Sequence, residues 1–188
     1  MDKIATHNSA TGEKSKNLLH ALFTPFAKCQ DKTIHEQYYY GVRWFDLRVD
    51  KDLTLCHGLW KSNKTLIDIL NEISRFEEEV YITVTIERKY STKVNIDLCE
   101  RICKAVKLRS KGKAKLVYIA CKLPKWNILH AYRSAPLVKN YISVPTPKQY
   151  LTLEFKDWRR YIPIPRILKK ITPARELSSQ WYTMVDFV

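Results

Sequence analysis

Several side chains that can transfer protons or bind phosphate fall at or near the carboxyl ends of predicted strands. They are His7, Asn8, Asp46, Arg48, His57, Glu87 and Asp186. Displacement at a phosphodiester requires a base for the attacking hydroxyl, an acid for the departing oxygen and a cation for the phosphoryl charge. Two histidines, one arginine and several carboxylates supply these roles without a cofactor. The set therefore indicates phosphodiester chemistry, although each residue taken singly also has a structural explanation.

The stretch from Gly41 to Trp60 contains three of these side chains. Side chains of a strand alternate between its two faces, so Asp46 and Arg48 share one face of the apolar run 42–49. Burying two charges there is unfavourable unless they pair or take part in function. They therefore form either an internal ion pair or part of a site that also includes His57.

Apolar periodicity predicts the elements that must position these residues. Predicted strands cover 3–6, 42–49, 53–58, 80–86 and 115–121, with weaker signals at 138–144, 150–155 and 181–188. Predicted helices cover 17–28, 33–40, 65–79, 92–108 and 173–179. The run at 80–86, VYITVTI, is followed directly by Glu87 and Arg88, so another predicted strand ends in charge.

Alternating strands and helices predict an α/β fold. Eight strand candidates favour a small, distorted (β/α)8 barrel with reduced helices, formed by a single domain over residues 1–188. The active site of such a barrel lies at the carboxyl ends of its strands. Because the chain is shorter than the roughly 200 residues usual for this barrel, an open doubly wound sheet is the alternative.

The chain is strongly basic, with 33 Lys and Arg against 19 Asp and Glu and a net charge of +14. This charge favours polyanions or anionic membrane surfaces as partners. The segment from Trp158 to Ile162 mixes aromatic and basic side chains, as segments at a bilayer interface do. Trp60 and Lys61 are expected to make a second contact of this kind.

The sequence also carries expectations about location. No apolar run approaches the roughly 20 residues of a spanning helix, and the amino-terminal residues do not resemble a signal peptide. Five cysteines show neither a CxxC pair nor zinc-like spacing, so reduced thiols are expected. These features predict a cytoplasmic or peripheral membrane protein.

Four segments together resemble the catalytic X region of bacterial phosphatidylinositol-specific phospholipase C. They are THNSATG at 6–12, YGVRWFDLRVD at 40–50, CHGLW at 56–60 and ARELSSQWYTMVDFV at 174–188. In order and approximate spacing they span most of the chain, although residues 123–172 match nothing. The resemblance implies a distorted (β/α)8 barrel that cleaves phosphatidylinositol, or a similar glycerophosphodiester, by attack of the inositol 2-hydroxyl. Diacylglycerol and a cyclic phosphate are the implied products.

The resemblance also implies a role for each matching residue. His7 matches the general base, and Asp186 matches the carboxylate that orients it. His57 matches the general acid. Arg48 matches the phosphate-binding residue that takes the place of calcium in metal-independent bacterial members, and Asp46 matches an acidic neighbour. Since His7 and Asp186 come from opposite ends of the chain, these roles require the first and last strands to be neighbours.

Two positions depart from the bacterial pattern. Asn8 stands where bacterial members have Asp, so the carboxylate that assists the general acid is missing and His57 is expected to use Asp46 instead. Glu87 stands where they have lysine. Calcium-dependent relatives carry Asn and Glu at these two positions, which makes Asn8, Asp46 and Glu87 an alternative calcium set. Because Arg48 would repel a divalent cation, a site without metal is favoured.

The substrate is expected to contact Asn8, Glu87, Arg88 and Lys122. The expected partners are a phospholipid substrate and an anionic membrane surface, bound peripherally by a monomer. A second hypothesis, motivated by Asn8 and the short chain, is a catalytically weakened barrel that binds anionic lipid or nucleic acid. The standard nucleic-acid-binding motifs are absent from the sequence, so nucleic acid is the less favoured partner.

Overall fold

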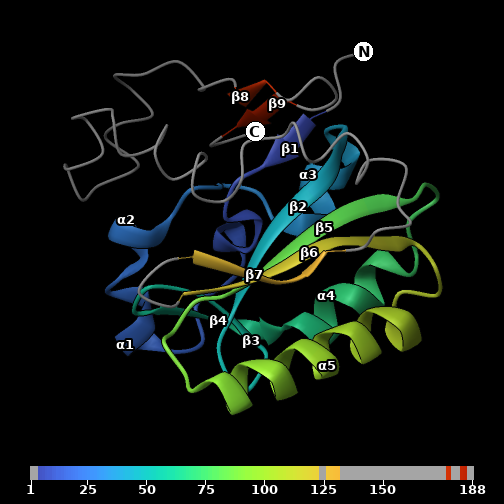
Figure 1. Ribbon diagram of the computed structural model, residues 1–188. Coiled ribbons are helices and arrows are strands. Elements are labelled where there is room, and N and C mark those ends of the chain that lie inside the picture. Colours follow the sequence, from blue (N-terminus) through green and yellow to red (C-terminus); the bar gives the residue numbers. More distant parts are fainter. Residues whose placement is uncertain (1–3, 123–125, 132–176, 179–182, 186–188) are drawn as a thin grey trace.

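A mixed sheet organises the part of the chain that the structure describes. The computed structural model describes residues 4–122, 126–131, 177–178 and 183–185 (Figure 1). Five parallel strands form the centre of the sheet in the order β6-β5-β2-β1-β9. Their bounds are β1 Ile4–Thr6, β2 Val42–Val49, β5 Val80–Ile86, β6 Ala114–Lys122 and β9 Thr183–Val185. The strands nearest the two ends of the chain are neighbours, as the predicted roles of the site residues require.

Antiparallel strands extend this parallel centre. β7 (Trp126–Ala131) pairs with β6, and β8 (Leu177–Ser178) pairs with β9. β3 (Thr54–His57) and β4 (Trp60–Thr65) form a hairpin that continues from β2. Within the described residues the sheet therefore runs from β7 at one edge to β8 at the other without closing. The predicted α/β class is confirmed, whereas these residues do not establish the predicted closed barrel.

The longer helices cover one face of the sheet. Buried residues of α3 (Ile34–Tyr39), α4 (Leu66–Ile73) and α5 (Thr92–Arg109) belong to one hydrophobic core, and α4 and α5 lie on the same side of the sheet in Figure 1. An open doubly wound sheet needs helices on both faces. The parallel strands β1, β2, β5 and β6 are also neighbours in chain order. Both observations disfavour the doubly wound alternative.

Local sequence explains where these helices begin. Thr33 and Thr65 each accept a hydrogen bond from the backbone amide three residues later, in capping boxes with Glu36 and Asp68. The buried face of α4 is formed by Leu66, Ile69, Leu70 and Ile73. This spacing places all four on one stripe of the helix, and burial stabilises the fold by about 1.5–3 kcal/mol for each such side chain.

The opposite face of the sheet carries the polar side chains. Along β2, Trp44, Asp46 and Arg48 face away from the helices, while the apolar residues between them enter the core. The parallel register pairs Asp46 with Thr83 and Arg48 with Thr85 on β5. The two charges of β2 therefore share a face with hydroxyl groups of the adjacent strand.

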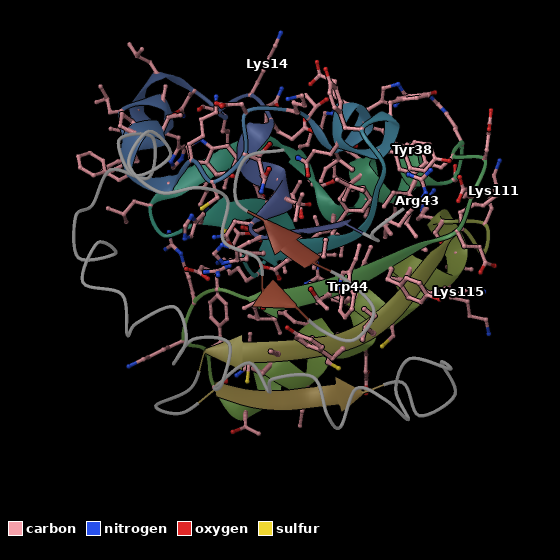
Figure 2. The ribbon with its side chains drawn as sticks, turned by 90° about the horizontal axis from the view of Figure 1, so that it is seen from above. Lys14, Tyr38, Arg43, Trp44, Lys111 and Lys115 are labelled. Carbon is pink, nitrogen blue, oxygen red and sulfur yellow. The ribbon has the colours of Figure 1, made fainter. Side chains whose placement is uncertain are left out.

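An aromatic and ionic cluster fixes the amino-terminal end of β2. Tyr38 of α3 stacks on Phe76 with the ring centroids 3.9 Å apart, and the Arg43 guanidinium lies 4.2 Å from the centroid of the Tyr38 ring (Figure 2). Arg43 also pairs with Glu78 at 2.8 Å. β2 is thus anchored to α3 and to the segment before β5 at the end remote from Arg48.

The segment predicted as one helix over 17–28 is two short helices, α1 (Leu18–Ala21) and α2 (Thr24–Ala27), which follow the 3₁₀ helix η1 (Ser9–Gly12). Pro25 lies in the first turn of α2, where its missing amide hydrogen is tolerated. The apolar side chains of α1 are largely exposed, although helical spacing of this kind is typical of a buried face.

Other differences concern element boundaries and polar strands. The helix predicted over 65–79 ends at Ile73, and β4 and β7 were not predicted. The helix predicted over 173–179 is wrong at Leu177–Ser178, which forms β8. The predicted strands at 138–144 and 150–155 and the segment from Trp158 to Ile162 lie outside the described residues.

The predicted rim contact of Trp60 is also wrong. Trp60 is 1% exposed, and its indole nitrogen donates a hydrogen bond to Ser15 Oγ at 2.9 Å. Lys61 pairs with the buried carboxylate of Asp50. Both side chains therefore attach the β3–β4 hairpin to neighbouring segments of the chain.

Two findings bear on location and redox state. No helix among the described residues is long and apolar enough to cross a bilayer. All five cysteines lie in the described part of the chain, and none of them forms a disulfide.

Candidate active site

The turn after β1 brings His7 and Asn8 to the carboxyl end of the sheet. Asn8 adopts the left-handed conformation with φ 46°, which Asn tolerates better than most residues. Its backbone amide donates to Asp46 Oδ2 at 3.3 Å, and its carbonyl accepts from Thr11 Oγ1 at 2.8 Å. The Thr11 hydroxyl also accepts from the backbone amide of Cys29 at 2.9 Å. This turn is thereby fixed to both β2 and the segment after α2.

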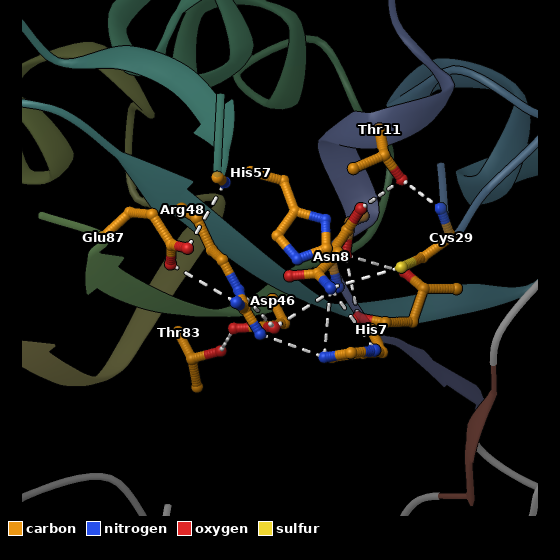
Figure 3. A network of polar contacts seen from close by, with 12 residues as sticks. His7, Asn8, Thr11, Cys29, Asp46, Arg48, His57, Thr83 and Glu87 are labelled. Atoms are coloured by element: carbon orange, nitrogen blue, oxygen red, sulfur yellow. Dashed lines mark hydrogen bonds and ion pairs between the residues drawn. The ribbon is translucent and has the colours of Figure 1, made fainter. Parts of the chain in front are cut away.

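Arg48 lies at the centre of the polar network (Figure 3). Its Nη2 is 3.1 Å from His7 Nε2, its Nη1 donates to Glu87 Oε2 at 3.3 Å, and its Nε is 4.0 Å from Asp46 Oδ2. The Arg48 side chain is 12% exposed. A nearly buried guanidinium is thus balanced by two carboxylates from different strands, which makes its ionisation compatible with burial.

Contacts with hydrogen-bond donors favour one tautomer of His7. The side-chain amide nitrogen of Asn8 lies 3.1 Å from His7 Nε2 and 3.5 Å from Nδ1. Arg48 Nη2 can only donate to Nε2, so this contact favours a neutral imidazole whose ring proton is on Nδ1. His7 is arranged as a base whose unprotonated nitrogen lies beside the guanidinium.

His57 is arranged differently. It ends β3, and its Nδ1 donates to the carbonyl oxygen of Ala27 at 2.7 Å. Because a carbonyl only accepts, the Nδ1 proton of His57 is fixed and any second proton belongs to Nε2. Figure 3 shows the ring directed toward the network that contains Asn8 and Arg48. The two histidines therefore use opposite nitrogens for their structural hydrogen bonds.

Asp46 and Glu87 hold this arrangement together. Asp46 accepts from Thr83 Oγ1 at 3.1 Å as well as from the Asn8 amide, whereas its expected hydrogen bond to His57 is replaced by that of the Ala27 carbonyl. Glu87 Oε1 accepts from the backbone amide of Gly58 at 3.3 Å. Glu87 thus ties the end of β5 to the turn that follows His57.

The structure brings six of the nine candidate residues into or beside this network. Arg88, by contrast, is exposed and has no hydrogen bond or ion pair among the described residues. The side chain of Lys122, at the end of β6, is outside the described part. Asp186 is also outside it, but the residue before it, Val185, pairs with Thr6, the residue before His7.

Sequence reasoning missed three contributors to the site. Thr83 had a partial signal, because alternation along VYITVTI places Thr83 and Thr85 on one face of the strand, and these two residues pair with Asp46 and Arg48. Gln30, whose side-chain amide donates to the His7 carbonyl at 3.1 Å, and the Ala27 carbonyl had no usable signal. Their role depends on how the chain turns after α2.

One thiol beside the site is unsuited to nucleophilic chemistry. Cys56 precedes His57 and is 3% exposed. Burial raises the pKa of this thiol to about 12, and the nearby Glu87 and Asp50 carboxylates contribute in the same direction. A thiol with this pKa stays protonated at neutral pH, so nucleophilic chemistry by Cys56 is disfavoured.

The alternative calcium set consists of oxygen ligands that lie beside Arg48. Among the described residues no group of three or more His, Cys, Asp or Glu is arranged to hold one. Asn8 Oδ1 is buried without a hydrogen bond there, and it is the one oxygen of the alternative calcium set with no donor. The Arg48 guanidinium, however, lies close to both carboxylates of that set. The guanidinium thus places a positive charge close to where a divalent ion bound to these carboxylates would lie.

Comparison with known proteins finds similarity in structure and none in sequence. No family model and no curated protein sequence matches the chain. Its structure is similar to that of phosphatidylinositol-specific phospholipase C from Listeria monocytogenes, with a TM-score of 0.54 and 13% identity over 100% of this chain and 88% of that chain. A Staphylococcus aureus phosphatidylinositol-specific phospholipase C gives a TM-score of 0.47 and 18% identity over 62% of this chain and 46% of that one. The chain thus shares, at the level of fold, the architecture of the Listeria enzyme.

Proposed function

We propose that this protein cleaves phosphatidylinositol, or a similar glycerophosphodiester, by general acid and base catalysis through a cyclic phosphate. The observation that carries the proposal is the arrangement of Arg48 between His7 and two carboxylates, with His57 beside the same network. The fold shared with a phosphatidylinositol-specific phospholipase C supports the choice of substrate class.

The proposed reaction begins with proton transfer to His7 Nε2 from the inositol 2-hydroxyl. The resulting oxygen nucleophile forms a bond to phosphorus, and the bond from phosphorus to the diacylglycerol oxygen breaks. His57 Nε2 donates a proton to that departing oxygen, so that diacylglycerol leaves as an alcohol and a five-membered cyclic phosphate remains. Arg48 balances the charge that develops on the non-bridging oxygens.

Asp186 is the proposed partner of His7 Nδ1. Parallel pairing of Thr6 with Val185 supports this role, because the next residue of each strand then continues at the same end of the sheet. A carboxylate on Nδ1 stabilises the imidazolium that forms when Nε2 takes a proton. The same pairing of first and last strands supports a distorted barrel as the full architecture.

We further propose that the reaction needs no metal ion. Arg48 lies 3.3 Å from a Glu87 oxygen and 4.0 Å from an Asp46 oxygen, and a divalent cation between these carboxylates would be repelled by the guanidinium. Full activity in the presence of a calcium chelator is the expected result. Strict dependence on added calcium would contradict this part of the proposal.

Release of diacylglycerol from phosphatidylinositol vesicles tests the function. We expect His7→Ala and His57→Ala each to lower turnover by about 10²–10⁴-fold, the usual contribution of a positioned proton-transfer group. His35→Ala is the matched control, because His35 is exposed on α3 and packs against Phe76 away from the network. Equal activity of the His57 variant and this control would contradict the proposal.

One observation favours a second function, a catalytically weakened barrel that binds anionic lipid. The side chain at position 8 is an amide whose Oδ1 has no hydrogen bond among the described residues, so no carboxylate assists the acid from that position. Absence of turnover on a panel of glycerophosphodiesters, combined with retained binding to anionic vesicles, would favour this alternative.

A further inference from the structure

A set of exposed apolar side chains lies close to the candidate active site and has no part in the proposed reaction. We name it the α1–α2 surface: Leu18, Leu19, Leu22, Phe26 and Leu59, which are 82%, 63%, 64%, 52% and 59% exposed. These are five of the ten large hydrophobic side chains that are exposed in the described part of the chain. Scattered exposed apolar residues are ordinary, but a concentration of them marks an interaction surface.

Hydrogen bonds fix this surface to the site. His20 Nδ1 is 3.0 Å from the carbonyl oxygen of Leu59, two residues after His57 in the chain. At the end of α2, the Ala27 carbonyl accepts the hydrogen bond from His57 itself. Figure 1 shows α1 and α2 at the side of the molecule next to the β3–β4 hairpin. Whatever binds this surface therefore lies near the acid of the proposed reaction.

The charge around the surface is mainly positive. Residues 14–30 contain three lysines and no Asp or Glu, and one of the three, Lys28, pairs with Asp31 at 3.3 Å. Lys14 and Lys16 are exposed, and their side chains form no ion pair with the described residues. Figure 2 shows Lys14 directed away from the ribbon. Short helices that expose leucine and phenylalanine beside unpaired lysines match the chemistry of an anionic bilayer, with acyl chains below and negative headgroups above.

We propose that the α1–α2 surface docks on anionic lipid bilayers. This inference rests on the proposed function for its purpose, which is to hold the site against a membrane that contains the substrate. Charge complementarity favours an anionic bilayer over a second copy of this chain as the binding partner. A second copy of this chain would bring the same lysines together and repel, whereas an anionic lipid surface attracts them and accepts the leucines.

Vesicle co-sedimentation tests the proposal without turnover. The probe is phosphatidylcholine vesicles with or without phosphatidylserine, because neither headgroup carries the hydroxyl whose attack on phosphorus the proposed reaction requires. We expect Leu18→Ser with Leu22→Ser to lower the partition coefficient on the mixed vesicles by at least about tenfold, since two apolar side chains lose their burial. The matched control is Ile96→Ser with Leu108→Ser on α5, at 51% and 61% exposure, which we expect to bind as the unaltered protein does.

Charge reversal at two positions distinguishes the effect of the lysines beside the α1–α2 surface from the effect of the protein's net charge. We expect Lys14→Glu with Lys16→Glu to lower binding to the mixed vesicles more than tenfold, whereas Lys104→Glu with Lys107→Glu on α5 has a much smaller effect. Equal losses in both pairs, or no loss in either, would overturn the proposal. So would a dimer in solution that the leucine substitutions dissociate, because the occupant would then be a second copy.

These outcomes are separable from the proposed reaction. If the protein binds anionic vesicles through this surface but cleaves no phosphodiester, only the proposed function fails. If it cleaves phosphatidylinositol while the leucine substitutions leave vesicle binding unchanged, only the docking surface fails. Each variant is compared by circular dichroism with the unaltered protein, and Phe26→Ser with Leu59→Ser replaces a leucine pair that does not fold.

Discussion

Arg48 is the residue on which the site depends. It contacts His7 and Glu87 and lies near Asp46, so one side chain of β2 connects the residues that directly follow β1 and β5. Its planar guanidinium offers several donors in fixed directions, which an ammonium cannot reproduce. The charge pair that stood out in the sequence is therefore better described as one cation shared between two carboxylates and a histidine.

Replacement of Arg48 by lysine tests this description. We expect Arg48→Lys to lower the rate of phosphatidylinositol cleavage by about 10²–10³-fold, as loss of a charge-stabilising donor does, while the protein remains folded. Steady-state kinetics on vesicles measure the effect. Arg101→Lys, an exposed change on α5, should leave the rate unchanged. Comparable rates for both variants would show that the fork geometry of Arg48 is dispensable.

A second residue-scale prediction concerns Gly12 in η1. A Cβ at this position would lie 1.8 Å from the backbone carbonyl oxygen of Lys32, so the backbone must move. We expect Gly12→Ala to lower the free energy of unfolding by about 3 kcal/mol or more. Chemical denaturation gives the value. Gly112→Ala has open space around it but a φ of +81°, and a smaller loss of about 1 kcal/mol is expected there.

At the scale of elements, a buried carboxylate joins η1 to β4 and α4. Glu13 is 6% exposed, accepts from the Ile34 backbone amide, and pairs with Lys64 at 2.9 Å. Lys64 also pairs with Glu72 at 2.6 Å. Burial opposes the charged form of Lys64, but hydrogen bonds to Glu72 and Glu13 outweigh it and raise the pKa of the ammonium. The ion pair of Glu13 with Lys64 thus fixes the end of η1, the helix that follows His7 and Asn8.

Lys64→Met should therefore destabilise the protein in a pH-dependent way. We expect a loss of about 1–3 kcal/mol near neutral pH, because Glu13 keeps its burial and loses a donor. Since the folded-state pKa of Lys64 is raised, its contribution is fully present below the ordinary value of 10.5 and declines as pH rises through the raised pKa. Unfolding free energies of both proteins from pH 8 to pH 11 check the sign. A difference that grows with pH would contradict it.

The elements also show what the sequence could predict. β5 and β6 were predicted correctly because strands covered by helices read as runs of branched apolar residues. β4, WKSNKT, has no such pattern and is held by pairing with β3, which periodicity does not report. The run that includes Leu18 and Leu22 was predicted as a helix from its spacing, but spacing does not report whether a helix has a partner in the core, and these side chains are exposed.

In the site, too, strand patterns were predictable from the sequence, whereas contacts that depend on the path of the chain were not. His7, Asp46, Arg48 and His57 were predicted because strand ends and alternation bring them to one edge of the sheet. The hydrogen bond from His57 to the Ala27 carbonyl was not predictable, since every residue carries a backbone carbonyl and only the path of α1 and α2 selects this one. Asp46 was expected to assist His57 and instead holds Asn8 and Thr83.

At the scale of the whole molecule, the site exists because the ends of the chain meet. β1 pairs with β2 on one side and with β9 on the other, so residues far apart in sequence join one sheet. The net charge of +14 favours anionic partners over the whole surface. The exposed α1–α2 surface near the candidate acid and this charge together support the docking on anionic lipid that we propose.

Phosphorus NMR of phosphatidylinositol incubated with the protein tests the central claim most directly, because the claim is intramolecular attack by the 2-hydroxyl. We expect the phosphodiester resonance to be replaced by that of a five-membered cyclic inositol phosphate, with no such change for His7→Ala. Direct appearance of an acyclic phosphate monoester, or an unchanged phosphodiester resonance with the unaltered protein, would contradict the account.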